Sequence, residues 1–599
     1  MLNFFVNFLF FLLRTCRTCD IIQTKTEEKM RLKITKTNST TNYYAIIDIK
    51  AEDGKRSTKI YKRLGNDQEI SKISNGELPI NWAKKQVAEL KKAYEEKTLK
   101  VIAEFSQSDL IEKNIQSSYN GGYLFLQDIY YSLGLDKICK DIADKYRIKY
   151  DLNSVLSNLI YTRIIEPSSK LSAFETAKNF LEQPNFELQN IYRALEIISK
   201  ETENIESAVY KNSLNVVKRN TKILYYDCTN YFFEIEEAEG LKQYGKNKEN
   251  RPLPIVQMGL FMDGDGFPLA FVIDSGNTNE QITLKPLEKQ IIKDFELSKF
   301  VVCTDAGLAS RENRIFNNMQ DRSFIVTQSL KKIKGHLKDW ALDKKGWHKL
   351  NSKELINLND IDNSSSNEEV YYKERWINEN DLSQRLIVSY SPKYAAYQKS
   401  VRNSQIERAQ KLINNPSSID KNRQNDPKRF VNFASVTADG ELADKKVLSL
   451  NQVAIDNEAM FDGFYAVCTT LEDNISDIIK VNKRRWEIEE SFRILKSDFK
   501  ARPVYLKRDD RIKAHFTTCF LALLIYRILE HKLDEKYSSS QIISTLRNMN
   551  FFKIAGSGYA PTYMRTDLTD ELHKTFNFRT DTEIVPFNIM KKIFRQTKK

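Results

Sequence analysis

The stretch Arg484–Phe499, RRWEIEESFRILKSDF, is the part of the chain from which fold and function are first read. At about 100° per residue, a helix here places Arg485, Glu489 and Lys496 within roughly 40° of one another. An adjoining apolar stripe predicts that this side of the helix faces a core. The stripe consists of Ile488, Phe492, Leu495 and Phe499. A solvated surface pair also places Arg and Glu four residues apart, so the rest of the chain must decide between the two interpretations.

Length and charge restrict the class of protein. A chain of 599 residues is too long for one compact core and predicts three or four domains. With 41% hydrophobic and 29% charged residues, the composition is that of a globular protein. The formal net charge of +13 favours a polyanionic partner, although much of the excess could be solvated surface.

The cysteines and histidines argue against a disulfide framework and against a zinc site. The seven cysteines are odd in number and lie mostly in apolar runs, which indicates reduced, buried thiols in a cytoplasmic protein. They are Cys16, Cys19, Cys139, Cys228, Cys303, Cys468 and Cys519. The first two have no second pair downstream, and the five histidines form no spaced pair. Any metal ion is therefore expected to be held by carboxylates.

Residues 1–220 predict three regions ahead of a sheet. The apolar run of residues 2–13 is too short to span a bilayer and lacks the flanks of a signal peptide, so we expect Met30 to be the natural start and 1–29 to be a non-native or disordered leader. Residues 30–105 predict strands over 31–65, with a turn at 52–54, and then a charged helix. Residues 106–220 are helical in periodicity and could bind DNA or simply pack as a bundle.

Residues 221–330 have the pattern of an α/β unit. TKILYYDCTNYFFEIE (221–236) predicts a buried strand, and the two apolar runs around Asp263-Gly264-Asp265-Gly266 predict a hairpin. A helix, the strand KFVVCTDAG (299–307), a second helix and the strand SFIVTQS (323–329) follow. This order predicts a mixed sheet with helices packed on it.

The rest of the chain divides into three further regions. Residues 331–460 are rich in Lys, Asn and Ser, include three tryptophans and predict a β-rich insertion with one helix over about 392–413. Residues 461–535 resume the core with a strand, the helix of the opening stretch and an apolar helix that is flanked by charge and predicts a core helix rather than a membrane span. Residues 536–599 predict a solvated basic tail.

Two further acids lie in unusual surroundings. Asp227 lies inside the first predicted strand and Asp305 at the end of a later one. An acid in an apolar strand is costly unless it is paired or metal-bound, although a turn or capping role is the alternative for each. With Glu489 they form a set of carboxylates of the kind that hard divalent cations such as Mg²⁺ prefer. Two such ions can stabilise the attacking and leaving oxygens of a phosphoryl displacement.

These motifs together resemble the DDE transposases of bacterial insertion sequences, in the insertion-sequence-four group with a Y-(2)-R-(3)-E-(6)-K signature. Arg485, Glu489 and Lys496 match the last three positions in register, whereas Asn482 stands at the tyrosine position. The surroundings of the acids are also similar, in the order YYDCTNYFFE, GLFMDGDGFPLAFVIDSGNTNE, VVCTDAGLASREN and RWEIEESFRILKSDFKARPVY. The resemblance extends from about residue 227 to 529.

The resemblance implies an RNase H-like catalytic core interrupted by the β-rich insertion. It implies Asp227, Asp305 and Glu489 as ligands of two Mg²⁺ ions, with Mn²⁺ as a substitute. It also implies DNA contacts by cations beside the catalytic helix, for which the candidates are Arg485, Lys496 and Arg493. Some relatives hold a flipped base with an insertion-domain tryptophan. The candidates for that role are Trp340, Trp347 and Trp376.

The expected partners are double-stranded DNA, as terminal inverted repeats and as target, and a second copy of the chain in a synaptic dimer. We expect a cytoplasmic protein that is associated with the nucleoid when bound to DNA. An RNase H-like nuclease that cuts without joining stays open as an alternative. A non-catalytic, decayed DNA-binding relative stays open as well, although it predicts a lost carboxylate and all three are present.

Overall fold

The computed structural model describes residues 29–599 apart from 38–39, 51–55, 75, 99–102, 104, 109, 112, 351, 353, 363, 365, 380, 416–426 and 437–441. The expected leader up to residue 28 and the turn at 52–54 lie outside the described residues. The chain forms two compact units. The first consists of Met1–Ser117, Phe552–Pro561 and Thr582–Met590, and the second of Ser118–Phe551, Thr562–Asp581 and Lys591–Lys599.

The N-terminal part of the first unit is an antiparallel three-stranded sheet followed by two helices. The strands are β1 (Lys29–Lys36), β2 (Thr41–Lys50) and β3 (Arg56–Asn66), paired in that order. Asn66 and Glu69 form a capping box at the start of α2 (Asp67–Ile73). The charged helix predicted from residue 81 is α3 (Pro79–Thr98), which begins with a proline because the missing N–H is no loss in the first turn. The strands and the helix predicted here are confirmed.

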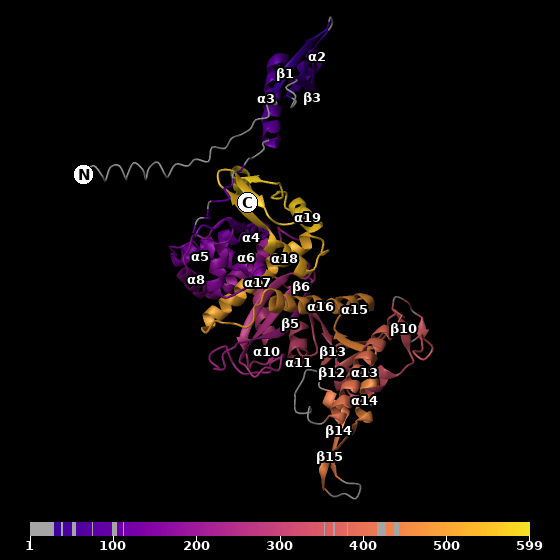
Figure 1. Cartoon of the computed structure of the whole chain (residues 1–599). Coiled ribbons are helices and arrows are strands. Elements are labelled where there is room, and N and C mark those ends of the chain that lie inside the picture. The colour runs from indigo at the N-terminus through magenta and orange to yellow at the C-terminus, as the bar shows by residue number, and fades with distance from the viewer. Residues whose placement is uncertain are drawn as a thin grey trace, which may run out of the picture. The chain divides into compact units, whose positions relative to one another are not determined.

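A ten-stranded mixed sheet forms the centre of the second unit (Figure 1). Its order is β11-β10-β12-β13-β16-β9-β8-β5-β6-β7. Only β8 runs parallel to its neighbours, β5 and β9, and the other described pairs are antiparallel. The strands are β5 (Ile223–Phe232), β6 (Ile255–Asp263), β7 (Pro268–Ser275), β8 (Val301–Thr304), β9 (Ser323–Thr327), β10 (Trp347–Lys349), β11 (Leu355–Ile356), β12 (Tyr371–Glu379), β13 (Leu382–Tyr390) and β16 (Phe464–Thr469).

The elements of residues 221–330 follow the predicted order. After β5 and the β6–β7 hairpin come α10 (Glu280–Asp294), β8, α11 (Arg311–Asn317) and β9. Apolar residues of α10 join those of β5, β6 and β8 in one buried cluster, so the helix covers one face of the sheet. The mixed α/β fold predicted for this segment is confirmed.

Strands of residues 331–460 extend the same sheet. β13 pairs with β16, so β10–β13 continue the hydrogen-bonded ladder outward from the central strands. The other elements are η1 (Leu330–Lys332), α12 (Gly335–Leu342), α13 (Pro392–Asn414), η3 (Pro427–Phe430), the paired strands β14 (Val431–Val436) and β15 (Leu442–Leu450), and α14 (Gln452–Ala459). This segment therefore adds strands and helices at one end of the sheet.

A helical bundle packs around one long buried helix. The predicted helical region contains α4 (Tyr123–Ser132), α5 (Leu135–Tyr146), α6 (Leu152–Ile165), α7 (Lys170–Ala177), α8 (Leu188–Lys200) and α9 (Thr202–Ser213), preceded by β4 (Ser118–Asn120). The apolar helix α17 (Asp509–Lys532) contacts α4, α6 and α8 and also β7. Among the described residues it is the one helix long and apolar enough to cross a membrane, but its most apolar window is 89% buried inside the protein. The prediction of a core helix is confirmed.

The basic tail is folded, contrary to expectation. It contains α18 (Ser539–Asn548), β17 (Asn550–Ile554), β18 (Gly558–Pro561), α19 (Asp567–Thr575), β19 (Val585–Pro586) and α20 (Phe587–Gln596). Met590, Ile593 and Thr597 are buried at helical spacing, so the lysines between them occupy only the outer side. The five cysteines of the described residues are free and buried, as predicted.

Candidate active site

The two aspartates lie on neighbouring parallel strands, Asp227 in the middle of β5 and Asp305 directly after the end of β8. In the register of β5 and β8, Tyr225 lies opposite Cys303, and each aspartate follows two residues later on its own strand. Residues two apart on a strand point to the same face, so Asp227 and Asp305 are adjacent on one face of the sheet. Burial, together with the negative charge of Asp305, raises the pKa of Asp227 to about 6.

Asp305 is fixed by the loop that follows it. Its Oδ1 accepts hydrogen bonds from the backbone N–H groups of Gly307 at 2.9 Å and Leu308 at 3.1 Å. A Cβ at position 307 would come within 3.3 Å of the same oxygen, so glycine allows the loop to fold this closely around the carboxylate. The turn-forming role considered from the sequence is therefore real, and it occupies one oxygen of the side chain.

Two lysines from other parts of the chain contact β5 directly after Asp227. The Nζ of Lys248 donates to the Cys228 carbonyl at 2.6 Å and lies 3.2 Å from Glu280 Oε1. The Nζ of Lys496 donates to Thr229 Oγ1 at 2.5 Å. Burial, together with the nearby positive charge of Lys248, lowers the pKa of Lys496 to about 8. The acidic pair thus has cations on the side where β5 continues.

The opening stretch forms two helical segments with different turns. After α15 (Ile475–Lys483), α16 (Trp486–Arg493) presents Glu489 at its exposed side, and the chain continues as a π-helix, η4 (Ile494–Asp498). A regular helix through residue 499 was expected, and this expectation was wrong. The wider turn changes the direction of Lys496 relative to α16, and such π turns are frequent at functional sites.

Arg485 is held by a chain of hydroxyl groups. Its Nη1 donates to Thr327 Oγ1 at 2.8 Å, and this oxygen lies 2.7 Å from the Tyr465 hydroxyl. The same hydroxyl accepts a hydrogen bond from Asn482 Nδ2 at 3.0 Å. Asn482 stands where the signature has a tyrosine, so a phenol hydroxyl from β16 is placed next to the residue that lacks one.

A cavity of about 800 Å³ opens beside Glu489. Its wall comes from α13, β13, β16, α15 and α16 and combines aromatic rings with cations. The wall includes Lys393, Tyr394, Tyr397, Tyr465, Lys483, Arg485, Trp486 and Glu489. Trp486 is 60% exposed, although a large apolar side chain is usually mostly buried. Such a cavity suits a flat, partly apolar group that carries negative charge.

The carboxylates fit a hard cation only in part. Asp227 and Asp305 bring two like charges together, which a divalent cation would neutralise. Among the residues that the structure describes, however, no three His, Cys, Asp or Glu side chains form a group that could hold a metal ion. Glu489 is therefore not gathered with the two aspartates in this arrangement.

The remaining candidates differ in their surroundings. Arg493 is engaged by Glu490 at 2.6 Å and Asp498 at 3.4 Å, which ties its charge to its own segment. Trp347 is 0% exposed and donates its Nε1–H to the Asp343 carbonyl, so it has no free face for a base and is withdrawn as a candidate.

Of the other two tryptophans, Trp340 is half-buried beside the cations of Lys373 and Arg375. Trp376 is 49% exposed.

Residues 231–525 match the family model described as the transposase DDE domain. The match supports a DDE transposase. The matched transposase domain contains Asp305 and Glu489 and begins four residues after Asp227.

Neither the solved structures nor the curated proteins provide further support for a function. The cryo-EM structure of a piggyBac transposase synaptic complex with hairpin DNA is similar over 79% of this chain and 84% of that chain. The identity is 9% and the TM-score is 0.34, which is too low to inform either fold or function. No curated protein matches the chain significantly.

Several residues of the site were missed in the sequence. Lys248 approaches Asp227, and Glu280 pairs with Lys248, because the loop before β6 and the start of α10 return to β5, which no local pattern reveals. Tyr465 was read as part of an ordinary strand. Trp486 was quoted within the decisive stretch, and its place outside the apolar stripe was a usable signal that the predictions did not take up.

Proposed function

We propose that the chain is a DNA transposase of the insertion-sequence-four type. It binds the ends of an insertion sequence, cleaves the DNA there and joins the freed 3′-hydroxyl groups to target DNA. The observation that carries this proposal is the pair Asp227 and Asp305 on adjacent parallel strands, directly before and within a segment that matches the transposase DDE domain.

In this proposal Asp227, Asp305 and Glu489 are the ligands of two Mg²⁺ ions, for which Mn²⁺ can substitute. Bound divalent cations would stabilise the charge that develops on the attacking and leaving oxygens of a phosphoryl transfer. The exposed position of Glu489 on α16 requires a shift of this helix, or of the side chain, toward the aspartates when DNA and metal bind. The raised pKa of Asp227 supports the need for a neutralising partner.

The chain's own cations would position the DNA. Arg485 is pre-oriented by Thr327 and can donate its remaining N–H groups to a phosphate. Lys496 is half-buried beside β5 and offers a second positive charge near the acidic pair. Arg493 is less suited to direct contact because its charge is already engaged by two carboxylates.

The cavity beside Glu489 would receive an unpaired base at the cleavage site. Trp486 and the tyrosines of α13 provide aromatic faces on which a base can stack. This assignment favours Trp486 over Trp340 and leaves Trp376 as the exposed candidate from the original three. Partners in this proposal are the terminal inverted repeats, target DNA and a second copy of the chain, and the protein acts in the cytoplasm on the nucleoid.

The deciding experiment is Mg²⁺-dependent processing of a supercoiled plasmid that carries the flanking element ends. Excision or insertion by the wild type, and none by Glu489→Gln, is the expected result. Cleavage that survives in Glu489→Gln would remove the central role of this carboxylate. Cleavage without joining would favour a nuclease, and end binding without cleavage would favour a decayed relative.

A further inference from the structure

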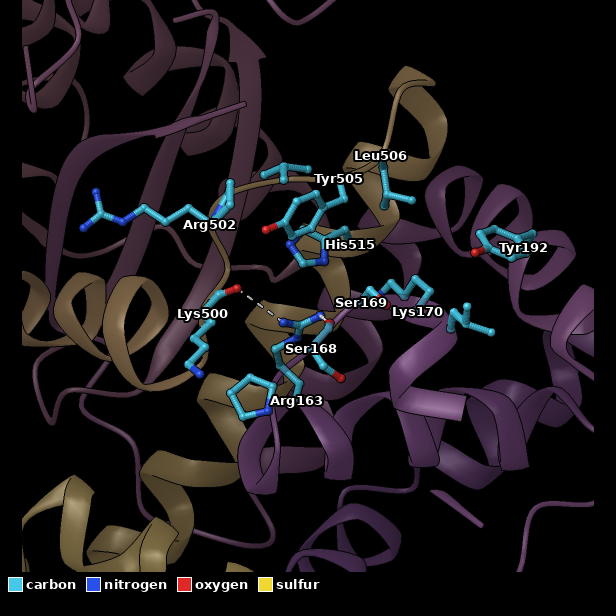
Figure 2. A pocket seen from close by; sticks show the side chains of 14 residues that line it. Arg163, Ser168, Ser169, Lys170, Tyr192, Lys500, Arg502, Tyr505, Leu506 and His515 are labelled. Atoms are coloured by element: carbon cyan, nitrogen blue, oxygen red, sulfur yellow. Dashed lines mark hydrogen bonds between the residues drawn. The ribbon is translucent and has the colours of Figure 1, made fainter. Parts of the chain in front are cut away.

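A second cavity lies apart from the acidic pair, beside the buried helix α17. Its volume is about 460 Å³, within the range of small-molecule sites. The loop between α6 and α7, the start of α7, residues 500–506 and His515 of α17 line it (Figure 2). The site is thus built by a segment of the bundle and by the chain just beyond η4.

Buried polar atoms without partners face this cavity. Lys170 is 6% exposed, and its Nζ has no hydrogen-bond partner among the described residues. The same holds for Nε of Arg163 and Oγ of Ser168. Arg163 is otherwise fixed, because Nη1 donates to the Phe499 carbonyl and Nη2 to the Ser168 carbonyl, each at 3.1 Å. Arg163 is therefore held in place, and the unpartnered groups can still donate hydrogen bonds to a ligand.

The cavity has an excess of positive charge. Its wall, all within the described residues, contains no Asp or Glu. Burial, together with the charge of Arg163, lowers the pKa of Lys170 to about 7. Arg502 is paired with Glu249 and extends away from the other labelled side chains in Figure 2. Arg163 and Lys170 thus remain without a counter-charge at the cavity.

A purely structural role does not explain this arrangement. A buried ammonium without a partner destabilises a fold, and an apolar side chain of similar volume would pack there at less cost. The start of α7 adds to the positive potential, because helix N-termini favour anions. Ser169 caps this helix by accepting from the Ser172 N–H at 3.1 Å, and the first two residues of the helix, Lys170 and Leu171, line the cavity with it.

We propose that this cavity binds the phosphate group of a phosphate ester. Lys170 and Arg163 would donate charge-assisted hydrogen bonds to its oxygens, and the Ser168 hydroxyl would supply a neutral donor. Leu171, Tyr192 and other apolar side chains of the wall would contact the organic part of the ester. The phosphate can belong to a free nucleotide or to a nucleic acid strand, and the site exists whether or not the chain cuts DNA.

The test uses the full chain and calorimetric titration with inorganic phosphate and with dAMP. Saturable binding is expected, and Lys170→Met should weaken it by about tenfold or more, because a charged hydrogen bond contributes roughly 1.5–3 kcal/mol. Lys200→Met, which removes an exposed lysine from the end of α8, is the matched control and should leave binding unchanged. Lys170→Arg should retain most of the affinity.

A second readout separates a binding site from a structural lysine. Without phosphate, Lys170→Met should unfold at the same temperature as the wild type or higher, since it removes an unpaired buried charge. If Lys170→Met did not fold, Ser168→Ala would be titrated instead, with weaker phosphate binding expected. No saturable binding of either probe, or equal binding by the wild type and Lys170→Met, would overturn the proposal.

The source of the phosphate is decided with a short single-stranded oligonucleotide. If Lys170→Met binds the oligonucleotide more weakly than Lys200→Met does, a strand phosphate occupies the cavity. If both variants bind it equally while only Lys170→Met loses dAMP, the ligand is a free nucleotide. Both results support a phosphate site.

Discussion

Replacing Arg219 by Met should loosen the hairpin whose strand β6 pairs with β5, the strand of Asp227. Arg219 and Asp263 form an ion pair at 2.6 Å, and both side chains are 0% exposed. Arg219 also donates to the carbonyls of Phe267 and Pro268, so one side chain holds both sides of the hairpin turn. The substitution leaves a buried carboxylate without its cation.

The expected cost follows from these contacts. Removing one partner of a buried pair costs about 3–5 kcal/mol, because the other charge stays desolvated. At about 1.4 kcal/mol per factor of ten, local opening of the hairpin should become roughly 100- to 4,000-fold more frequent. Burial already raises the pKa of Asp263, and loss of Arg219 raises it further, so protonation should make the cost smaller at pH 5 than at pH 8.

Hydrogen exchange followed by mass spectrometry measures this opening in peptides that cover β6 and β7. Arg193→Met, a substitution of an exposed arginine on α8, is the matched control and should leave exchange unchanged. Asp263→Asn in the Arg219→Met background should restore part of the protection, because it removes the stranded charge. Exchange in Arg219→Met within threefold of the wild type would refute the reasoning.

Three further predictions concern the site and the core. Lys496→Ala should weaken complexes with element ends, as measured by gel shift, because it removes a cation beside β5, and unchanged binding and cleavage would contradict its phosphate role. Trp486→Ala should weaken binding of an unpaired strand by about tenfold, given roughly 1–3 kcal/mol per stacked base, whereas Trp376→Ala should not. Burial raises the pKa of Glu206 to about 8, so its contribution to stability is present at acidic pH and is lost as the pH rises toward 8. Glu206→Gln should therefore gain in unfolding temperature relative to the wild type between pH 5 and pH 8.5, and an equal difference at both pH values would show that Glu206 does not titrate in this way.

Local pattern was sufficient for the elements that carry the acids. Asp227 lies inside the largely buried strand β5, Asp305 directly follows the short strand β8, and an acid in such a place stands out in the sequence. Their adjacency was not predictable, since it depends on the register between β5 and β8, which is set by helices and strands far along the chain. The position of Glu489 relative to the aspartates was not predictable either. Spacing in the sequence identified this residue, but its distance from the aspartates depends on how α16 packs.

Side-chain environment was harder to predict than element type. Trp347 and Trp376 both lie in strands next to a basic side chain, and only the packed structure distinguishes the buried ring from the exposed one. The π turn of η4 leaves the apolar stripe of the opening stretch intact, so periodicity did not reveal it. At the C-terminus, the many lysines concealed the buried stripe of Met590, Ile593 and Thr597.

The order of strands in the large sheet bears on how such a chain can change over evolution. Because β10–β13 are added beyond β16, their exchange for another module leaves every backbone hydrogen bond around β5 and β8 in place. Insertions or deletions in residues 331–460 therefore need not alter the strand pairing around the aspartates. The exchange has one requirement: β16 would become an open edge, and a variant without β13 must cover that edge by other means to avoid aggregation.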